Sequence, residues 1–347
     1  MKTLLFYLLF PVLLCLAFAG KTGYEFLYPD YFPTPVYDFS KNPLSTERVE
    51  LGRVLFYDPI LSKDGAISCA SCHSPYNGFA HTDHDLSHGI ADQIGTRNAP
   101  PLFNLAWHTS FMWDGAINHL DMQALAPISH PKEMGENIEN VVRKLQHIPG
   151  YPGLFYRAFG DSLITGEHVL KALSQFQLTL VSAHSKYDNV KKGKTQFSQP
   201  EENGYALFQK NCNSCHREPL FSNFGFANNG LPVDTTLYDF GKGQITQRKE
   251  DSLKFKIPSL RNLSYTYPYM HDGRFRRLSE VLSHYTHGIQ ENETLAAELK
   301  TPLSLTPDEK TDLIAFLLTL NDSAFVFDPK HQFPKEILQP GEGLLKQ

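Results

Sequence analysis

Two short stretches decide the fold of this chain, Cys69-Ala-Ser-Cys72-His73 and Cys212-Asn-Ser-Cys215-His216. Each is a C-x-x-C-H sequence, which is the attachment signature of c-type haem. In this chemistry the two thiols add to the vinyl groups of the haem, and the imidazole that follows binds the iron. The sequence therefore predicts two covalent haem sites, with His73 and His216 as the proximal iron ligands.

Other uses of these cysteines fit the sequence less well. A zinc site needs a tetrahedral set of Cys and His, and a His directly after the second Cys suits that geometry poorly. A pair of redox dithiols would need a βαβ context, which the sequence does not indicate. The chain has 5 Cys, and the two motifs use all of them except Cys15, so no disulfide is expected.

The beginning of the chain predicts export. Lys2 precedes an apolar run over residues 4–18, which ends at the small-x-small sequence Ala17-Phe18-Ala19. We interpret residues 1–19, including Cys15, as a signal peptide; an uncleaved N-terminal anchor is the alternative. No second apolar run of about 18 residues follows, so we expect a periplasmic protein without a stable membrane span.

The composition is that of an ordinary globular protein. A chain of 347 residues with 41% hydrophobic and 20% charged residues is too apolar for disorder and too polar for a membrane bundle. At roughly 150 residues per domain, it has the length of two domains. The net charge of -5 gives no electrostatic case for nucleic-acid binding.

A weak internal repeat places one haem motif in each half. Its matched stretches are Glu50-Leu-Gly52-Arg-Val-Leu-Phe56 with Glu202-Asn-Gly204-Tyr-Ala-Leu-Phe208, Arg97-Asn98 with Arg261-Asn262, Trp113-Asp114-Gly115 with His271-Asp272-Gly273, Leu120 with Leu278, and the apolar runs 173–180 with 313–320. Both apolar runs have helical spacing, and Thr306-Pro307-Asp308-Glu309 is a capping box. The prediction is a mainly α fold of two cytochrome c-like helical domains, residues 20–185 and 186–347.

The repeat also predicts that the two irons differ. Seven residues after the repeated leucine, the first half has Pro127 and the second half has Tyr285. If both residues lie over the free face of their haem, Pro127 leaves the first iron open to a small ligand, whereas the Tyr285 phenol closes the second. The alternative is that Tyr285 is a buried aromatic residue of the core.

From residue 45 to about 325 the sequence resembles the bacterial di-haem cytochrome c peroxidases and the related MauG family. The motifs that carry the resemblance are 68–73, Gly95-x-Arg97-Asn98-Ala99-Pro100, 113–115, Gln123, Glu133-Met134, Pro258-x-Leu260-Arg261-Asn262 and 266–273. The resemblance implies a haem in each domain and a calcium ion between the domains. Related enzymes are often dimers, and a homodimer is compatible with the sequence.

The resemblance also implies roles for single residues. His73 would hold the peroxide-reacting haem and His216 the electron-transfer haem. Trp113 would lie between the haems, with Gln123 and Glu133 as the polar pair beside the first. The remaining implied positions are His271 near the haem edges, and the Asn98 side chain with the Thr266 and Pro268 carbonyls as calcium ligands.

Peroxide chemistry agrees with the role implied for Glu133. Cleavage of the O–O bond needs a proton taken from the near oxygen and returned to the far one, and a carboxylate can do both. A haem pocket would raise the pKa of Glu133, which helps it act in both directions. Gln123 can orient peroxide but cannot move a proton. Either residue could instead be an ordinary polar side chain at the surface.

Three departures from the peroxidase pattern stand out. The peroxidase subgroup commonly has Met where this chain has Tyr285, and Tyr is similar to the MauG type. MauG-type enzymes are understood to oxidise a partner through a surface Trp, but only Trp107 and Trp113 are present, so such a route would need Tyr205 or Tyr238. His88 lies near the place of a loop histidine that binds the first iron at rest, with a different spacing; solvated loop histidines are the alternative.

Three functions remain open at this point. The first is reduction of hydrogen peroxide to water with electrons from a small periplasmic cytochrome c or cupredoxin. The second is a MauG-like oxidation of residues in a partner protein. The third is a non-catalytic di-haem electron carrier, which an open first haem beside Gln123 and Glu133 disfavours.

Overall fold

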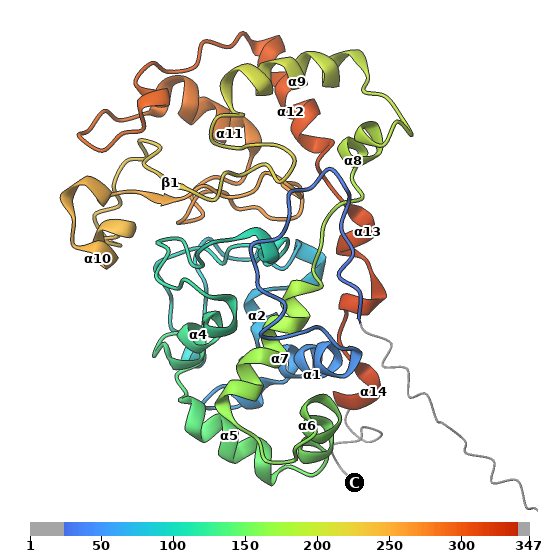
Figure 1. Ribbon diagram of the computed structural model, residues 1–347. Helices are drawn as coiled ribbons and strands as arrows, with labels where there is room; N and C mark the ends of the chain where they lie inside the picture. The colour runs from blue at the N-terminus through green and yellow to red at the C-terminus, as the bar shows by residue number, and fades with distance from the viewer. Residues whose placement is uncertain (1–23, 339–347) are drawn as a thin grey trace, which may run out of the picture.

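The computed structural model describes residues 24–338, so the predicted signal peptide and Cys15 lie outside the described residues. Short helices joined by long loops make up two stacked halves, with α1, α5, α6 and α7 in one and α9, α11 and α12 in the other (Figure 1). A two-stranded sheet is the only sheet formed by residues 24–338. The predicted mainly α fold with two cytochrome c-like parts is confirmed.

The first half contains α1 (Thr46–Tyr57), α2 (Cys69–Cys72), α3 (Leu120–Gln123), α4 (Leu125–Ser129), α5 (Ile138–His147), α6 (Tyr151–Phe159) and α7 (Gly166–Leu178). The second half contains α8 (Lys186–Lys191), α9 (Gln199–Asn211), α10 (Lys242–Thr246), α11 (Leu278–Ser283) and α12 (Pro307–Leu318). β1 (Phe226–Ala227) pairs antiparallel with β2 (Phe255–Lys256). A π-helical turn, His284–Gly288, continues α11, and the chain ends in α13 (Ser323–Val326) and α14 (Lys335–Leu338).

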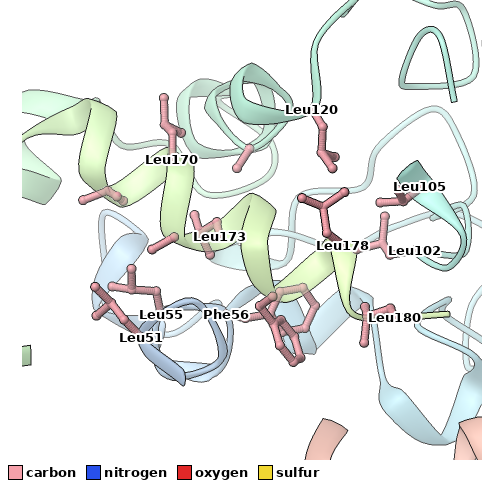
Figure 2. Packing of buried hydrophobic residues seen from close by; sticks show 14 of the residues in the cluster. Leu51, Leu55, Phe56, Leu102, Leu105, Leu120, Leu170, Leu173, Leu178 and Leu180 are labelled. Carbon is pink, nitrogen blue, oxygen red and sulfur yellow. The ribbon is translucent and has the colours of Figure 1, made fainter. Parts of the chain in front are cut away.

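The core of the first half lies between α1 and α7. Leu51, Leu55 and Phe56 of α1 and Leu170 and Leu173 of α7 belong to one hydrophobic cluster, and all five side chains are buried (Figure 2). Each such burial contributes roughly 1.5–3 kcal/mol. This packing fixes the frame from which α2 presents the first haem motif, because α2 also contacts α1.

The core of the second half repeats this arrangement with α9 and α12. Phe208 of α9 packs on Phe316 of α12, and both are fully buried. The predicted capping box at the start of α12 is confirmed, since Thr306 Oγ1 accepts from the Glu309 amide (3.2 Å) and Glu309 accepts from the Thr306 amide (2.7 Å). The two apolar runs of the repeat are therefore equivalent helices.

The repeated glycines explain why these helix pairs can approach so closely. A Cβ added at Gly52 would lie 1.9 Å from the carbonyl oxygen of Ala172 in α7, and one added at Gly204 would lie 1.9 Å from that of Asp312 in α12. Backbone atoms cannot move aside as a flexible side chain can, so only glycine fits at either crossing. The two stretches that precede the haem motifs are thus similar because each forms the same kind of close helix crossing.

We expect Gly52→Ala to lower the free energy of unfolding by about 2–3 kcal/mol, because the added methyl group overpacks the α1–α7 crossing. Chemical denaturation of the haem-loaded protein measures this change. Gly153→Ala is the matched control, since Gly153 is an exposed helix residue with open space around its Cβ position. There the same substitution should stabilise by about 0.5–1 kcal/mol. Equal effects of the two substitutions would contradict the crossing argument.

One match of the repeat is wrong. The amide of Asn262 donates to the Leu320 carbonyl (3.2 Å), and the residue that makes the corresponding bond to Leu180 is Asn104 (2.8 Å), not Asn98. In both halves the Asn side chain also accepts an amide two residues after that leucine. Asn104 and Asn262 share a positive φ, 55° and 64°. The Arg-Asn dipeptide was therefore a misleading similarity.

The end of the chain departs from the predicted division into residues 20–185 and 186–347. Phe325 and Val326 of α13 belong to the hydrophobic core of the first half, where the ring centroid of Phe325 lies 6.0 Å from that of Phe79. Glu336 of α14 pairs with Arg53 of α1 (2.7 Å). The C-terminal segment thus returns to the first half, as Figure 1 shows. The boundary at residues 185 and 186 stays a prediction.

Among residues 24–338, none of the helices has the length and apolar character needed to cross a bilayer.

Candidate active site

The first C-x-x-C-H motif borders a cavity of about 410 Å³. Cys69 and Cys72 lie on α2, and His73 follows directly, with its ring at the cavity wall. His73 Nδ1 lies 2.8 Å from the Phe79 carbonyl oxygen, which fixes Nδ1 as the donor and leaves Nε2 free to bind a metal. Burial lowers the pKa of His73 to about 4, so the ring is neutral, as an iron ligand must be.

The second motif borders a separate cavity of about 210 Å³. Cys212, Cys215 and His216 all line it, beside apolar residues of α11 and α12. His216 Nδ1 lies 3.1 Å from the Pro258 carbonyl oxygen, and burial lowers the pKa of this ring as well. The two histidine rings are therefore oriented in the same way, because in each case a backbone carbonyl oxygen lies within hydrogen-bond distance of Nδ1.

The four cysteines of the described chain are not joined in disulfides. Burial raises the pKa of Cys69 and of Cys212 to about 12 and that of Cys72 to about 11. Redox dithiols work through thiols of lowered pKa, so these values argue against that alternative. Paired thiols, a neutral imidazole and an adjoining cavity fit a covalently attached haem in each half.

Both residues of the predicted polar pair, Gln123 and Glu133, line the first cavity. Gln123 at the end of α3 is buried, and its side-chain oxygen lies 3.5 Å from Gln177 Nε2. Glu133 lies on the loop after α4, with one carboxylate oxygen 3.7 Å from His130 Nδ1. Burial raises the pKa of Glu133 above the ordinary Glu value, although His130 opposes this effect. Pro127 of α4 also lines this cavity.

Tyr285 lines the second cavity at the position that matches Pro127 in the first. It lies in the π-helical turn after α11, and such turns often occur at functional sites because they re-aim one side chain. Burial raises the pKa of the Tyr285 phenol to about 12, partly offset by a hydrogen bond with Asn229. The geometry thus places a non-ligating residue at one cavity and a phenol at the other.

Trp113 connects the two cavities, since its side chain lines both. Its indole NH donates to the Asn98 carbonyl oxygen (2.9 Å), which fixes the ring at the boundary between the halves. His271 lines the second cavity and stacks on Phe255, with ring centroids 3.6 Å apart. Burial lowers the pKa of His271, so its ring is neutral.

Comparisons with known proteins agree with this geometry. The family model described as di-haem cytochrome c peroxidase matches residues 46–196, and the cytochrome c model matches residues 201–321. The methylamine utilization protein MauG of Methylorubrum extorquens is 38% identical over 85% of this chain and 83% of its own length. This chain belongs to the di-haem cytochrome c peroxidase and MauG family.

Relatives named MauG and relatives named cytochrome c peroxidase are both similar to this di-haem oxidoreductase. Cytochrome c551 peroxidase of Nitrosomonas europaea is 35% identical over 80% of this chain and 81% of its own length. Among solved structures, a MauG-like protein associated with microbial copper homeostasis has a TM-score of 0.81 and 30% identity, and the match covers 90% of this chain and 99% of that one. The family implies two haem c groups, one for each cavity.

The second cavity is bordered by all three candidate calcium residues of this di-haem oxidoreductase, Asn98, Thr266 and Pro268. Asn98 Nδ2 donates to the Asp85 carbonyl (3.1 Å), which leaves its side-chain oxygen for another partner. The residues from 24 to 338 form no cluster of three or more His, Cys, Asp or Glu side chains that could hold a metal. A calcium ion here would therefore depend on amide and carbonyl oxygens.

The loop histidine His88 is not among the residues that line the first cavity. Its Nδ1 lies 2.8 Å from Asp92, and its ring stacks on His84 at 4.2 Å between centroids. We expect His88→Ala to leave the EPR spectrum of the resting oxidised enzyme unchanged, because the ring is held by these contacts. His84→Ala is the matched control. A new high-spin ferric signal in the His88 variant alone would show instead that His88 binds the first iron.

Two basic side chains at the first cavity were missed by sequence reasoning. His108 and Lys256 both line it, and Lys256 also lines the second cavity. For Lys256 the one signal in the sequence was its place between the apolar residues Phe255 and Ile257. Arg97, noted only as part of a motif, binds Asp239 through two hydrogen bonds (2.6 and 2.8 Å) and thereby joins the halves.

Proposed function

We propose that this chain is a periplasmic enzyme that reduces hydrogen peroxide to water, using two electrons and two protons for each peroxide. The observation that carries the proposal is the first cavity, where His73, Glu133 and Gln123 converge and Pro127 stands where the second half has Tyr285. When bound there, haem would supply an iron that accepts a peroxide oxygen and exchanges electrons.

The protein's own side chains would do the remaining work. Glu133 would take the proton from the near oxygen of peroxide and return it to the far oxygen, and its raised pKa suits both steps. Gln123 would hold peroxide by hydrogen bonds from its amide. Trp113 would couple the two haems, because its ring borders both cavities.

Electrons would enter through the second half from a small periplasmic cytochrome c or cupredoxin. His216 would bind the second iron, with Tyr285 as its second ligand and His271 near the haem edges. Asn98, Thr266 and Pro268 would hold a calcium ion between the two haems, which suits the preference of Ca²⁺ for oxygen ligands. The leader predicted over residues 1–19 supports export to the compartment in which this donor works.

A second function deserves testing because of Tyr285. A phenol at the second iron favours its oxidised form, whereas Met favours the reduced form. This preference supports a MauG-like enzyme that uses peroxide to oxidise residues of a partner protein. The 2 Trp of the chain argue the other way, since Trp107 and Trp113 are 2% and 9% exposed. A surface route would depend on a tyrosine such as Tyr238, which is 68% exposed.

Steady-state turnover separates the functions. The haem-loaded enzyme is mixed with hydrogen peroxide and a reduced small cytochrome c, and oxidation of the cytochrome is followed optically. Peroxide-dependent turnover supports the proposal. Absence of turnover, with peroxide-dependent oxidation of a partner protein detected by mass spectrometry, supports the MauG-like function. Absence of any reaction with peroxide contradicts both and favours an electron carrier.

A further inference from the structure

Lys256 is a buried cation without a hydrogen-bond or ion-pair partner among the described residues. Only 9% of the residue is exposed, and its Nζ atom has no hydrogen-bond partner within the described part of the chain. None of the ion pairs formed by residues 24–338 includes it. Placing an unpaired ammonium in a protein interior is costly, so a buried lysine normally faces a carboxylate or another anion.

The position of Lys256 is fixed by the sheet and by the first half. It lies on β2, opposite Phe226 of β1, and its amide donates to the Trp113 carbonyl (2.7 Å). Its side chain lines both haem cavities, but its Nζ lies 5.5 Å from the ring centroid of Phe111, which lines only the first. Lys256 thus belongs to the second half of the chain, but its ammonium group lies at the cavity of the first haem.

The carboxylates that border the first cavity are engaged elsewhere. Asp114 pairs with Arg97 at 2.5 Å, and Glu133 lies beside His130. His108 also lines this cavity, but burial and the charge of Lys256 lower the pKa of its ring well below the usual value, so His108 supplies no negative charge. Without an anion, burial lowers the pKa of Lys256 to about 7. The cavity thus has a positive corner that its own acidic groups do not neutralise.

We propose that Lys256 is the counter-ion of a propionate group of the first haem. Haem carries two carboxylates, and its covalent attachment at Cys69 and Cys72 limits where they can lie in the cavity. A propionate at Lys256 would satisfy the ammonium and tie the first haem to the second half through β2. Lys256 is thus a positioning residue. The inference requires haem in the first cavity but not the peroxidase reaction.

The reduction potential of the first haem tests this inference in the haem-loaded enzyme. A cation near haem favours the reduced iron, so Lys256→Met should lower the potential by at least a tenfold change in the reduction equilibrium, which is 59 mV for one electron. Lys256→Arg keeps the charge and should stay close to wild type. Lys254→Met is the matched control, because it removes the same charge from a lysine 3.5 Å from Asp251 that does not border the cavity. EPR-monitored redox titration distinguishes the two haems.

Equal potentials in Lys256→Met and Lys254→Met would overturn the proposal. An equal fall in Lys256→Met and Lys256→Arg would also overturn it, because packing and not charge would then be responsible. A crystal structure of the wild-type haem-loaded enzyme gives a second test if Lys256→Met fails to acquire haem. It should show Nζ within about 3.2 Å of a propionate oxygen of the first haem. An ammonium bound to water or to protein groups alone would contradict the inference.

Discussion

Replacing Glu133 by Gln should slow the reaction of the enzyme with hydrogen peroxide by about 10²–10⁴-fold, the usual contribution of a positioned acid–base group. The substitution keeps the size of the side chain and its place at the first cavity but removes its ability to accept a proton. Stopped-flow absorbance of the haem bands measures the rate. The haem content should stay the same, because Glu133 is not one of the attachment residues Cys69, Cys72 and His73, and Gln keeps the size of its side chain.

The pH dependence of the same rate adds a second test of Glu133. Burial raises the pKa of this carboxyl, so its base form appears only above the ordinary range of Glu. In the wild-type enzyme the rate should therefore rise with pH through this raised pKa, and the rise should vanish in Glu133→Gln. Glu139→Gln is the matched control, since Glu139 is an exposed residue of α5. An unchanged rate in Glu133→Gln would show that another group moves the proton.

Replacing Tyr285 by Met should raise the reduction potential of the second haem by on the order of 100 mV or more, since axial ligands set haem potentials over about 0.8 V. A phenolate stabilises the oxidised iron, whereas a thioether stabilises the reduced iron. Tyr285 lies in the π-helical turn at the second cavity, and a Met at this position would start from the same backbone site. Spectroelectrochemical titration of the haem-loaded enzyme measures the shift.

Tyr269→Phe is the control for this substitution. Tyr269 borders the same cavity, but its hydroxyl donates to the Leu263 carbonyl oxygen (2.9 Å), so it is committed to the protein. Its replacement should change the potential of the second haem much less than Tyr285→Met does. Potentials that agree between the two variants would mean that Tyr285 is a core aromatic residue, as in the alternative interpretation of the sequence.

Local sequence was sufficient wherever chemistry depends on neighbouring residues. The two C-x-x-C-H motifs act within one turn of chain, and the α12 capping box depends on Thr306 and Glu309, three residues apart. The repeat was readable because Gly52 and Gly204 meet the same steric demand at their helix crossings. Pro127 and Tyr285 followed from counting along equivalent helices, and both line their cavities.

Features that depend on distant parts of the chain could not be predicted. The match of Asn98 with Asn262 was wrong because the two Arg-Asn pairs look alike in sequence, whereas the hydrogen bonds to Leu180 and Leu320 define the equivalence. The return of α13 to the first half rests on long-range burial of Phe325. The position of Lys256 between two cavities likewise arises only when β2 meets Trp113.

The central claim is that the two haems differ, with the first open to peroxide and the second closed by Tyr285. EPR spectroscopy of the resting, fully oxidised enzyme, recorded with and without azide, tests this claim most directly. We predict a high-spin ferric signal from the first haem that azide converts to low spin, and a second signal that azide leaves unchanged. Two low-spin signals that both ignore azide would contradict the account, because neither iron would then have a free position for peroxide.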